Sequence, residues 1–313
     1  MAAPNPRIRP YGTAAIEAGA ALIREGGIVA VPTETVYGLA ADAGNAAAVA
    51  RIYAAKGRPS FNPLIVHVPD LAAAEALAVL NDEARVLAER WWPGPLTLVL
   101  PLRRKVPEGY APIAGLVTAG LDTVAIRVPA HRAMQGLLVA AARPLAAPSA
   151  NRSNGLSPTR AAHVATSLGE AVPLIIDDGA CAAGVESTIV QGRTILRPGP
   201  ITAEQLGLVA DRAPRTGGPI TAPGQLAIHY APAKPLRLDA TDAVPGEYLI
   251  GFGAVAGDAT LSAAGDPVEA AATLFDALHR ADASDRPRIA VAPIPRAGLG
   301  EAINDRLARA ATR

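Results

Sequence analysis

Two cations lie two residues apart in a loop rich in glycine and proline. Lys56 and Arg58 occur in the stretch KGRP, directly after a run with helical spacing, and Asn62 follows in the stretch NPL. A lysine is a point charge and an arginine is a fork of donors, so the two together could bind one polyphosphate. Cations at a helix C-terminus also interact favourably with the helix dipole, which is the purely structural alternative.

A second polar segment follows a short apolar run that is typical of a buried strand. The stretch PTETVYGL, residues 32–39, contains Thr33, Glu34, Thr35 and Tyr37. Ligands of open α/β sheets bind at the carboxyl ends of the strands, which favours a binding site here. A strand-to-helix turn, in which a threonine caps the next element, explains the same residues without a ligand.

A third segment is PSAN at residues 148–151, which leads to SPT at residues 157–159. Ser149 and Asn151 are two residues apart, so in an extended segment both side chains would face the same side. Serine, asparagine and proline are also ordinary loop residues, and turn chemistry alone is the alternative for this segment.

Two charged or titratable residues lie inside apolar strand-like runs. Arg127 occurs in AIRVP, and a buried arginine needs an anionic partner, either a protein carboxylate or a ligand. His67 occurs in LIVHVP, where a histidine is more often a satisfied core residue than a ligand. A fourth polar segment is GVEST at residues 184–188 followed by RPG at residues 197–199. Between them the chain resembles a hairpin that turns at residues 191–193.

Several common catalytic motifs are absent from the sequence. Lys56 is not part of a P-loop, no G-x-G-x-x-G opens a helix after the first strand, and no nucleophile elbow joins a strand to a helix. The five histidines share no metal-ligand spacing, so no metal site is predicted. The lone Cys181 excludes an internal disulfide and fits a reducing compartment.

Composition restricts the class of protein further. The chain of 313 residues carries 29 Lys and Arg against 28 Asp and Glu, a net charge of +1, which excludes a globally basic nucleic-acid coat but not a local basic pocket. A hydrophobic content of 50% excludes global disorder. The first 25 residues contain several charges, and no long uncharged apolar run occurs, so neither a signal peptide nor a membrane span is expected. A cytoplasmic protein is predicted.

The order of apolar and Ala-rich runs predicts α/β layering. Helices are expected over residues 13–25, 45–56, 266–281 and the last 16 residues, and strands over residues 63–69, 96–101, 123–129, 144–150 and 173–179. Residues 201–235 are punctuated by Pro and Gly, which predicts an ordered linker without a helix. We therefore expect a first domain over residues 8–200, this linker, and a small second α/β domain over residues 236–313.

Taken together, these segments resemble the motifs of the YrdC/Sua5 family. PTETVYGL, KGRP with NPL, HVP, PSAN with SPT, and GVESTIV with RPG occur in the family's order within residues 8–200. HYAP at residues 229–232 and the tail are similar to the linker and C-terminal domain of the longer Sua5 form. The resemblance implies a twisted mixed sheet with helices, a positively lined concavity, and a small C-terminal Rossmann-like domain.

The resemblance also implies an activity, the synthesis of threonylcarbamoyl-AMP. The expected substrates are L-threonine, bicarbonate and ATP, with Mg²⁺ accompanying the ATP, and pyrophosphate is released. The product would serve the N6-threonylcarbamoyl modification of adenosine 37 in tRNA. A tRNA or the transferase protein of this modification is therefore an expected partner, and no membrane is involved.

The same resemblance assigns roles residue by residue. Lys56 and Arg58 would be catalytic, and the linker would fold over the opening of the site. The residues implied to bind threonine are Thr35, His67, Arg127, Ser149 and Ser187. The residues implied to bind ATP are Arg58, Asn62, Thr123, Asn151, Thr159, Arg197 and Tyr230.

Two other functions remain open at this stage. A binding module for double-stranded RNA or tRNA would use the same basic concavity. A carbamoyltransferase component of hydrogenase maturation shares the YrdC-like domain, but it normally also carries acylphosphatase-like and zinc-finger regions, for which this sequence gives no sign.

Overall fold

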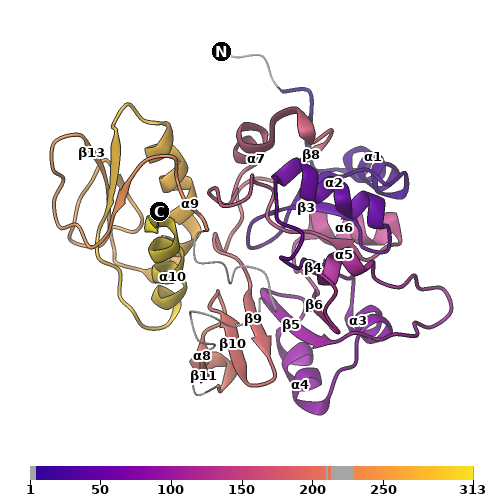
Figure 1. The fold of residues 1–313 in the computed structure, drawn as a ribbon. Helices are drawn as coiled ribbons and strands as arrows, with labels where there is room; N and C mark the ends of the chain where they lie inside the picture. The colour runs from indigo at the N-terminus through magenta and orange to yellow at the C-terminus, as the bar shows by residue number, and fades with distance from the viewer. Residues whose placement is uncertain (1–4, 209–210, 213–228, 313) are drawn as a thin grey trace.

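The computed structural model describes residues 5–208, 211–212 and 229–312 (Figure 1). Within these residues the chain forms a large mixed sheet and, after residue 235, a smaller parallel sheet. Figure 1 shows helices around each sheet, with α9 on the side of the smaller unit that faces the larger one. The predicted α/β class with a twisted mixed sheet is confirmed.

The large sheet has the strand order β1-β8-β2-β3-β7-β4-β6-β5-β9-β10-β11. Half of its strand pairs are parallel and half antiparallel, and two of the antiparallel pairs, β2–β3 and β9–β10, are hairpins. Its strands are β1 (Ile8–Pro10), β2 (Val29–Pro32), β3 (Tyr37–Asp42), β4 (Ile65–His67), β5 (Leu96–Pro101), β6 (Thr123–Arg127), β7 (Leu145–Ala146), β8 (Ile175–Asp177), β9 (Thr188–Gln191), β10 (Thr194–Arg197) and β11 (Asp211–Arg212).

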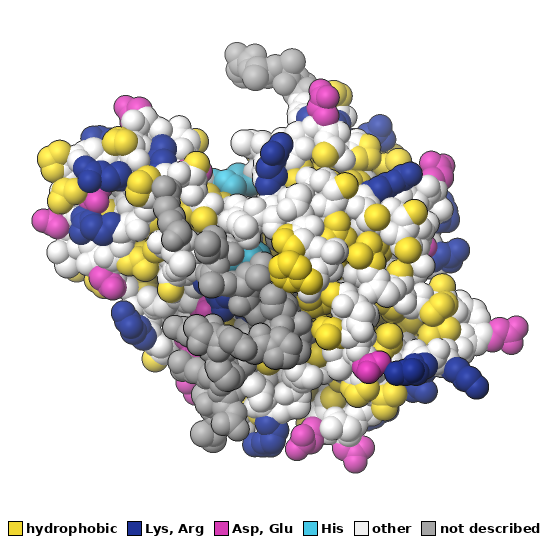
Figure 2. Space-filling view, viewed as in Figure 1, with side chains coloured by type: hydrophobic (Ala, Val, Ile, Leu, Met, Phe, Trp, Pro, Cys, Tyr) yellow, Lys and Arg dark blue, Asp and Glu magenta, His cyan; other side chains and the backbone are white. Residues whose placement is uncertain are grey.

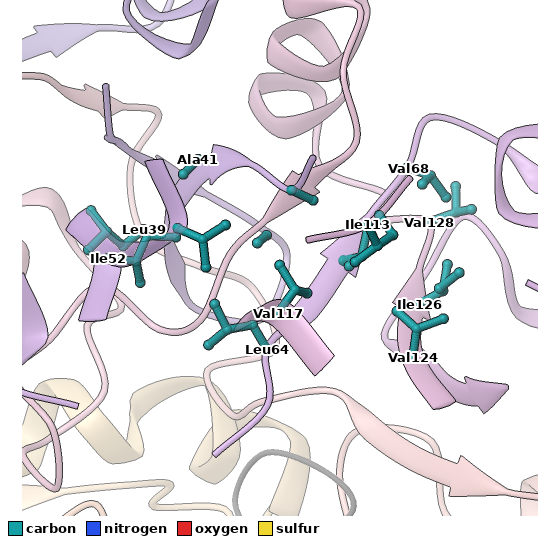
Figure 3. Packing of buried hydrophobic residues seen from close by; sticks show 14 of the residues in the cluster. Leu39, Ala41, Ile52, Leu64, Val68, Ile113, Val117, Val124, Ile126 and Val128 are labelled. Atoms are coloured by element: carbon teal, nitrogen blue, oxygen red, sulfur yellow. The ribbon is translucent and has the colours of Figure 1, made fainter. Parts of the chain in front are cut away.

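Helices cover both faces of this sheet. They are α1 (Thr13–Arg24), α2 (Ala46–Lys56), α3 (Leu71–Leu77), α4 (Asp82–Trp91), α5 (Gly115–Thr118), α6 (Arg132–Ala141) and α7 (Ala161–Leu168), and the 3-10 turn η1 (Gly169–Ala171) follows α7. Side chains along β3 alternate between the two faces. Leu39 belongs to the same buried cluster as Ile52 of α2 and Val117 of α5 (Figure 3), whereas Ala40 belongs to the cluster that contains Ile23 of α1. This period of two is typical of a strand buried on both sides.

Helix α2 places the predicted cation pair. The Asn45 side chain accepts hydrogen bonds from the N–H groups of Ala47 and Ala48, which caps the first turn. Gly57 ends the helix in the left-handed conformation with a φ of 59°, which a glycine adopts without a steric penalty. Both boundaries agree with the sequence prediction of a helix over residues 45–56, and Lys56 therefore lies in its last turn.

The segment after β2 is a hairpin turn and not the beginning of a helix. The Thr33 hydroxyl accepts hydrogen bonds from the N–H groups of Thr35 and Val36 and donates one to the Val36 carbonyl at 2.7 Å. The chain then returns as β3, antiparallel to β2, with Val31 opposite Gly38. A threonine does satisfy local backbone groups here, as the structural alternative expected, but it does so in a strand-to-strand turn.

The smaller sheet is entirely parallel, with the order β12-β15-β13-β14. Its elements are β12 (Leu236–Arg237), β13 (Glu247–Gly251), β14 (Ala259–Thr260), α9 (Pro267–Ala283), β15 (Arg288–Val291) and α10 (Leu299–Ala311). Residues 236–312 do not form its apolar core by themselves. Leu156, Val185 and Tyr230 pack into the same cluster as Phe275 of α9. The two sheets are therefore joined by shared apolar packing.

The segment between the two sheets differs in one respect from the prediction. Residues 203–206 form a short helix, α8 (Ala203–Leu206), although no helix was expected. A capping box explains it, because the Thr202 hydroxyl accepts from the Gln205 N–H while the Gln205 side chain accepts from the Thr202 N–H. Leu226 and Ile228, which the sequence groups with His229 and Tyr230 as an apolar cluster, lie outside the described residues.

Polar contacts also join α9 to the first domain. The Arg160 Nε atom donates to Asp276 Oδ1 at 2.7 Å, and the His163 and His279 rings stack with their centroids 3.8 Å apart. Gly184, with a φ of 69°, lies so close to Ala271 that a side-chain carbon there would overlap with the backbone of α9. None of the helices in the described ranges is both long and apolar enough to cross a membrane.

The stacked histidines predict a pH dependence of stability. Burial, and then the neighbouring His279, lower the pKa of His163 from 6.5 to about 4. The unfolded chain binds this proton first, so the free energy of unfolding should fall as the pH drops from about 6.5 to about 4 and then level off. Urea unfolding at pH 7 and pH 5 measures the loss. For His163→Phe, which keeps a ring in the stack, the loss should be smaller by on the order of 1 kcal/mol. Equal losses in both chains would contradict this assignment.

Candidate functional site

One cavity gathers most of the predicted polar residues. It encloses about 550 Å³ of empty space, including its mouth, and lies where β2, β4, β6 and β10 end. Ligand sites at such strand ends are typical of open α/β sheets. Eight of the predicted residues line it, namely Thr35, Arg58, His67, Arg127, Ser149, Ser187, Arg197 and Tyr230.

Arg127 organises one end of the cavity. Its Nη1 atom donates to the Thr35 hydroxyl at 2.9 Å, and its Nε atom donates to the Gly94 carbonyl at 3.1 Å. The anionic partner that the sequence required is Glu34, whose Oε1 atom lies 2.5 Å from Arg127 Nη2. Burial acts to raise the pKa of Glu34, but the charge of Arg127 outweighs it and lowers the pKa below its usual value. Glu34 is therefore a carboxylate at neutral pH.

His67 lies beside Arg127 because β4 and β6 pair in register at these two residues. Burial, followed by the charge of Arg127, lowers the pKa of His67 to about 3, so the imidazole is neutral at pH 7. Its Nδ1 atom has no hydrogen-bond partner among the described residues. A buried ring nitrogen without a partner on a cavity wall can bind a polar ligand.

Ser187 and Arg197 lie together on the cavity wall. The Ser187 hydroxyl lies 2.8 Å from the Thr97 hydroxyl and accepts a hydrogen bond from Arg197 Nη2 at 3.1 Å. Arg197 also donates through Nε and Nη2 to the Ser187 carbonyl, so its guanidinium has a fixed orientation. The sequence analysis missed Thr97. The available signal was a polar residue inside the apolar run LTLVL, the same signal that singled out Arg127.

The two cations of the KGRP loop differ in their placement. Arg58 lies on the cavity wall and donates to the Asn62 and Pro63 carbonyls at 3.3 and 3.0 Å. Burial lowers the pKa of Arg58 to about 10, which still leaves it charged at pH 7. Lys56 lies behind the wall, where its Nζ atom donates to the carbonyls of Ser149 and Asn151. Burial, and then Arg58, lower the pKa of Lys56 well below its usual value.

The PSAN segment does not have the extended conformation that the sequence analysis assumed. The Asn151 N–H donates to the Ser149 carbonyl at 3.0 Å, so the backbone turns between the two residues. Ser149 lines the cavity, whereas the Asn151 amide donates to the Arg152 and Gly155 carbonyls at 2.9 and 2.7 Å. The alternation of side chains along a strand therefore does not apply here.

Three further predicted residues are buried but do not line the cavity, namely Asn62, Asn151 and Thr159. The Asn62 amide, the Asn151 Oδ1 atom and the Thr159 hydroxyl have no hydrogen-bond partner in the described part of the chain. Buried polar atoms without a partner cost free energy, so groups of this kind commonly receive a water molecule or a ligand.

Thr123 is not brought to this site. It begins β6, and Arg127 ends the same strand, so at about 3.3 Å per residue the two lie about 13 Å apart. Thr123 instead lines a separate pocket with residues of α4, β5 and the β9–β10 turn. The implied contact between Thr123 and ATP therefore finds no support in the position of this residue.

His229 and Tyr230 close the cavity from the segment between the two sheets. Tyr230 has a φ of 63° and is 1% exposed, and its ring packs edge-on against His229 at 4.0 Å. Its hydroxyl has no partner among the described atoms. Burial, and then the charges of Arg58, Lys56 and Arg197, lower the pKa of His229 well below its usual value. The wall is thus cationic, and His229 is neutral.

The sequence analysis also missed a charge pair at the cavity wall. Glu186 accepts a hydrogen bond from Ser157 and forms an ion pair of 2.7 Å with Arg306 of α10. Glu186 occurs in the GVEST segment, but its partner lies in the C-terminal domain. In the described ranges no group of three or more His, Cys, Asp or Glu residues could hold a metal ion.

Fold and site together define a ligand-binding α/β protein with a cationic cavity at the strand ends of its large sheet, next to the segment that leads to the smaller sheet. The chain belongs to the Sua5, YciO and YrdC family, whose model, described as telomere recombination, matches residues 21–199. A second model, described as the C-terminal domain of threonylcarbamoyl-AMP synthase, matches residues 201–312. The resemblance to the long Sua5 form is thereby confirmed.

The similar proteins cover almost the whole chain. The threonylcarbamoyl-AMP synthase of Bacillus subtilis is 41% identical over 95% of this chain and 92% of its own length. That of Pyrococcus abyssi is 39% identical over 94% of this chain and 93% of its own. The crystal structure of P. abyssi Sua5 complexed with L-threonine superposes with a TM-score of 0.86 at 36% identity, covering 97% of this chain and 96% of that one.

Arg58 and Lys56 should both be needed for turnover, for different reasons. Arg58→Ala removes a guanidinium from the cavity wall and should raise the KM for ATP. Lys56→Ala removes the hydrogen bonds that hold the turn at Ser149, so it should raise the KM for threonine as well. Loss of one such contact to a transition state costs about 2–4 kcal/mol, or about 30- to 1,000-fold in kcat/KM. Steady-state pyrophosphate release measures both.

Arg51→Ala is the matched control, since Arg51 lies on the same helix and donates to the Gly26 carbonyl away from the cavity. Near-normal rates of pyrophosphate release in Lys56→Ala and Arg58→Ala would mean that the two cations act only on the helix dipole.

Proposed function

We propose that the chain is an L-threonylcarbamoyladenylate synthase that acts as a nucleotidyltransferase. The observation that carries the proposal is a single cavity whose two ends differ in chemistry. One end presents Thr35, neutral His67 and Arg127, and the other presents Arg58 and Arg197. The first end would therefore suit an amino acid, and the second a triphosphate. The names of the similar proteins in B. subtilis and P. abyssi support the same activity.

The reaction joins three substrates in two bond-forming steps. The amine of threonine and bicarbonate form an N-carboxylate with loss of water. An oxygen of this carboxylate attacks the α-phosphorus of ATP, and the bond to pyrophosphate breaks. A carbamate oxygen is a weak nucleophile, so the protein must chiefly hold it in line with the phosphate and stabilise the developing charge.

The threonine end would bind its substrate through hydrogen bonds. The Ser149 and Ser187 hydroxyls and the His67 Nδ1 atom can bind the polar groups of threonine, while Arg127 attracts its carboxylate. A neutral imidazole suits this role, because it can accept a hydrogen bond from the amine without repelling it. The ion pair with Glu34 fixes the position of the Arg127 guanidinium.

The nucleotide end would neutralise phosphate charge. Arg58 and Arg197 lie on the wall with their backbones and guanidinium groups fixed by hydrogen bonds to carbonyls. Buried polar atoms of Asn62, Asn151 and Thr159 have no hydrogen-bond partner among the described residues, which suits contacts to the nucleotide or to ordered water. Preorganised cations of this kind stabilise a charged transition state without reorganisation during the reaction.

Magnesium would enter with the triphosphate. Of the described residues, Glu186 is the carboxylate that lines the cavity, and it already pairs with Arg306. The wall therefore fits a cation whose ligands are phosphate oxygens and water, as Mg²⁺ prefers. When bound, the ion would offset charge on the phosphates.

Tyr230 and His229 would keep water from the product. Threonylcarbamoyl-AMP is a mixed anhydride, and a site that excludes water limits its hydrolysis. We assign residues 8–200 to the catalytic domain, 201–235 to a linker over the site, and 236–313 to the C-terminal domain. Tyr230 comes from the part of this linker that the structure describes.

The product would pass to the enzyme that transfers the threonylcarbamoyl group to adenosine 37 of tRNA, in the cytoplasm. The alternative of a double-stranded RNA module receives no support from the face in Figure 2. On that face Lys and Arg side chains are interspersed with Asp and Glu, and a hollow separates the two domains. A duplex-binding surface would need a continuous basic stripe.

One assay tests the proposed activity and its specificity. Purified chain, ATP and bicarbonate should release pyrophosphate only when threonine is added. A site that hydrogen-bonds the hydroxyl rejects valine more strongly than serine, which lacks only a methyl group worth about 1–3 kcal/mol. Serine should therefore be a poor substrate and valine a worse one. Pyrophosphate release that ignores threonine would refute the synthase, and equal rates for all three would refute the assignment of the threonine end.

Tyr230 should contribute more to the binding of the nucleotide than to the binding of threonine. Tyr230→Ala removes the ring that closes the cavity, so the KM for ATP should rise about tenfold, equivalent to 1.4 kcal/mol. Tyr230→Phe keeps the ring and should show what the buried hydroxyl contributes. Tyr248→Ala, on β13 of the C-terminal domain and away from the cavity, is the control. An unchanged KM for ATP in Tyr230→Ala would mean that this segment is only a tether.

A further inference from the structure

Arg306 is a fully buried cation of the C-terminal domain that lies behind the cavity wall. Its side chain is 0% exposed. The Nε atom donates to Glu186 Oε2 at 2.7 Å, and Nη2 donates to the Glu186 carbonyl at 3.3 Å. Its Nη1 atom donates to Asp305 at 2.9 Å, and its guanidinium carbon lies 5.2 Å from the centre of the Tyr230 ring. One side chain therefore touches two residues that line the cavity.

The position of Arg306 on α10 is unusual for a charge. Ile303, Leu307 and Ala310 of the same helix are buried in the apolar core, and Arg306 lies on that buried face. Taking a guanidinium out of water costs several kcal/mol unless ion pairs and hydrogen bonds compensate. Here the compensation comes from the adjacent Asp305 and from Glu186, which is 120 residues earlier in the chain. The contact with Glu186 thus exists only when the two domains are packed together.

Glu186 would be harmful to phosphate binding if it were unpaired. It lines the same cavity as Arg58 and Arg197, and it interacts electrostatically with Arg197. A free carboxylate there would compete with a triphosphate for Arg197 and would repel the phosphates directly. Burial acts to raise the pKa of Glu186, but Arg306 and then Arg197 lower it below the usual value, so Glu186 is charged in the intact protein.

We infer that Arg306 is a positioning residue for the triphosphate half of the cavity. It neutralises Glu186 and supports the Tyr230 ring, so that Arg58 and Arg197 remain available to phosphate. The C-terminal domain thereby completes the nucleotide site from outside the catalytic domain. This inference rests on the proposed function, since it assigns the cationic end of the cavity to ATP.

The test compares ATP binding by calorimetry with steady-state kinetics in the full chain. Arg306→Met should weaken ATP binding about tenfold or more, whereas the KM for threonine should change less than about threefold. Adding Glu186→Gln to Arg306→Met removes the unpaired carboxylate that lines the cavity, while Asp305 keeps its ion pair with Arg309, and the double change should restore most of the lost ATP affinity. Replacing both members of a buried ion pair is commonly tolerated, so the double variant should fold even where Arg306→Met does not.

Arg237→Met is the matched control. Arg237 pairs with the buried Glu247 at 2.7 Å, also within the C-terminal domain, but neither residue lines the cavity. This variant should lower the unfolding midpoint and leave ATP binding unchanged. A merely structural role of Arg306 would produce the same pattern as this control.

Three outcomes overturn the inference. They are equal ATP affinity in Arg306→Met and the unaltered chain, equal losses for threonine and ATP, and a folded double variant that still binds ATP as weakly as Arg306→Met. Failure of the unaltered chain to bind ATP would instead overturn the proposed function, and the inference with it. The inference is supported if Arg306→Met binds ATP weakly and the double variant regains most of the affinity.

Discussion

The site depends on one constraint, that several cations are buried around one cavity and most of them lack a carboxylate of their own. Lys56, Arg58 and Arg197 are held by backbone carbonyls, which fix their direction without neutralising their charge. Burial lowers the pKa of each of them, a sign that their charge is costly in this environment. An anionic ligand would offset that cost, which is the physical reason to propose that this end binds phosphate.

The opposite end of the cavity follows a different rule. There Arg127 does have a carboxylate, Glu34, and the neighbouring His67 is neutral. This end therefore carries little net charge and offers directional hydrogen bonds, which suits a small zwitterion. The contrast between the two ends arises from the turn after β2, since Glu34 and Thr35 both lie in it. Under the proposed function, this difference in local charge over one cavity would separate amino-acid binding from phosphate binding.

Features that arise from neighbouring residues could be predicted from the sequence, whereas contacts between distant residues could not. The limits of α2 followed from Asn45 and Gly57, since capping acts within one turn. The need of Arg127 for an anion was also predictable, but its identity as Glu34 was not, because the pairing depends on the β2–β3 hairpin meeting β6. The common direction of Ser149 and Asn151 was predicted wrongly, since a local turn replaced the extended strand.

The sequence by itself determined the family, the α/β class and the residue types of the site, because the motifs are short and each is built from neighbouring residues. Only the tertiary structure decided that Lys56 lies behind the cavity wall, that Thr123 lies at the far end of its strand, and that Arg306 reaches Glu186. These outcomes depend on the packing of distant elements into a common core. The energy of a buried charge depends on all the groups around it, and no local pattern in the sequence records that environment.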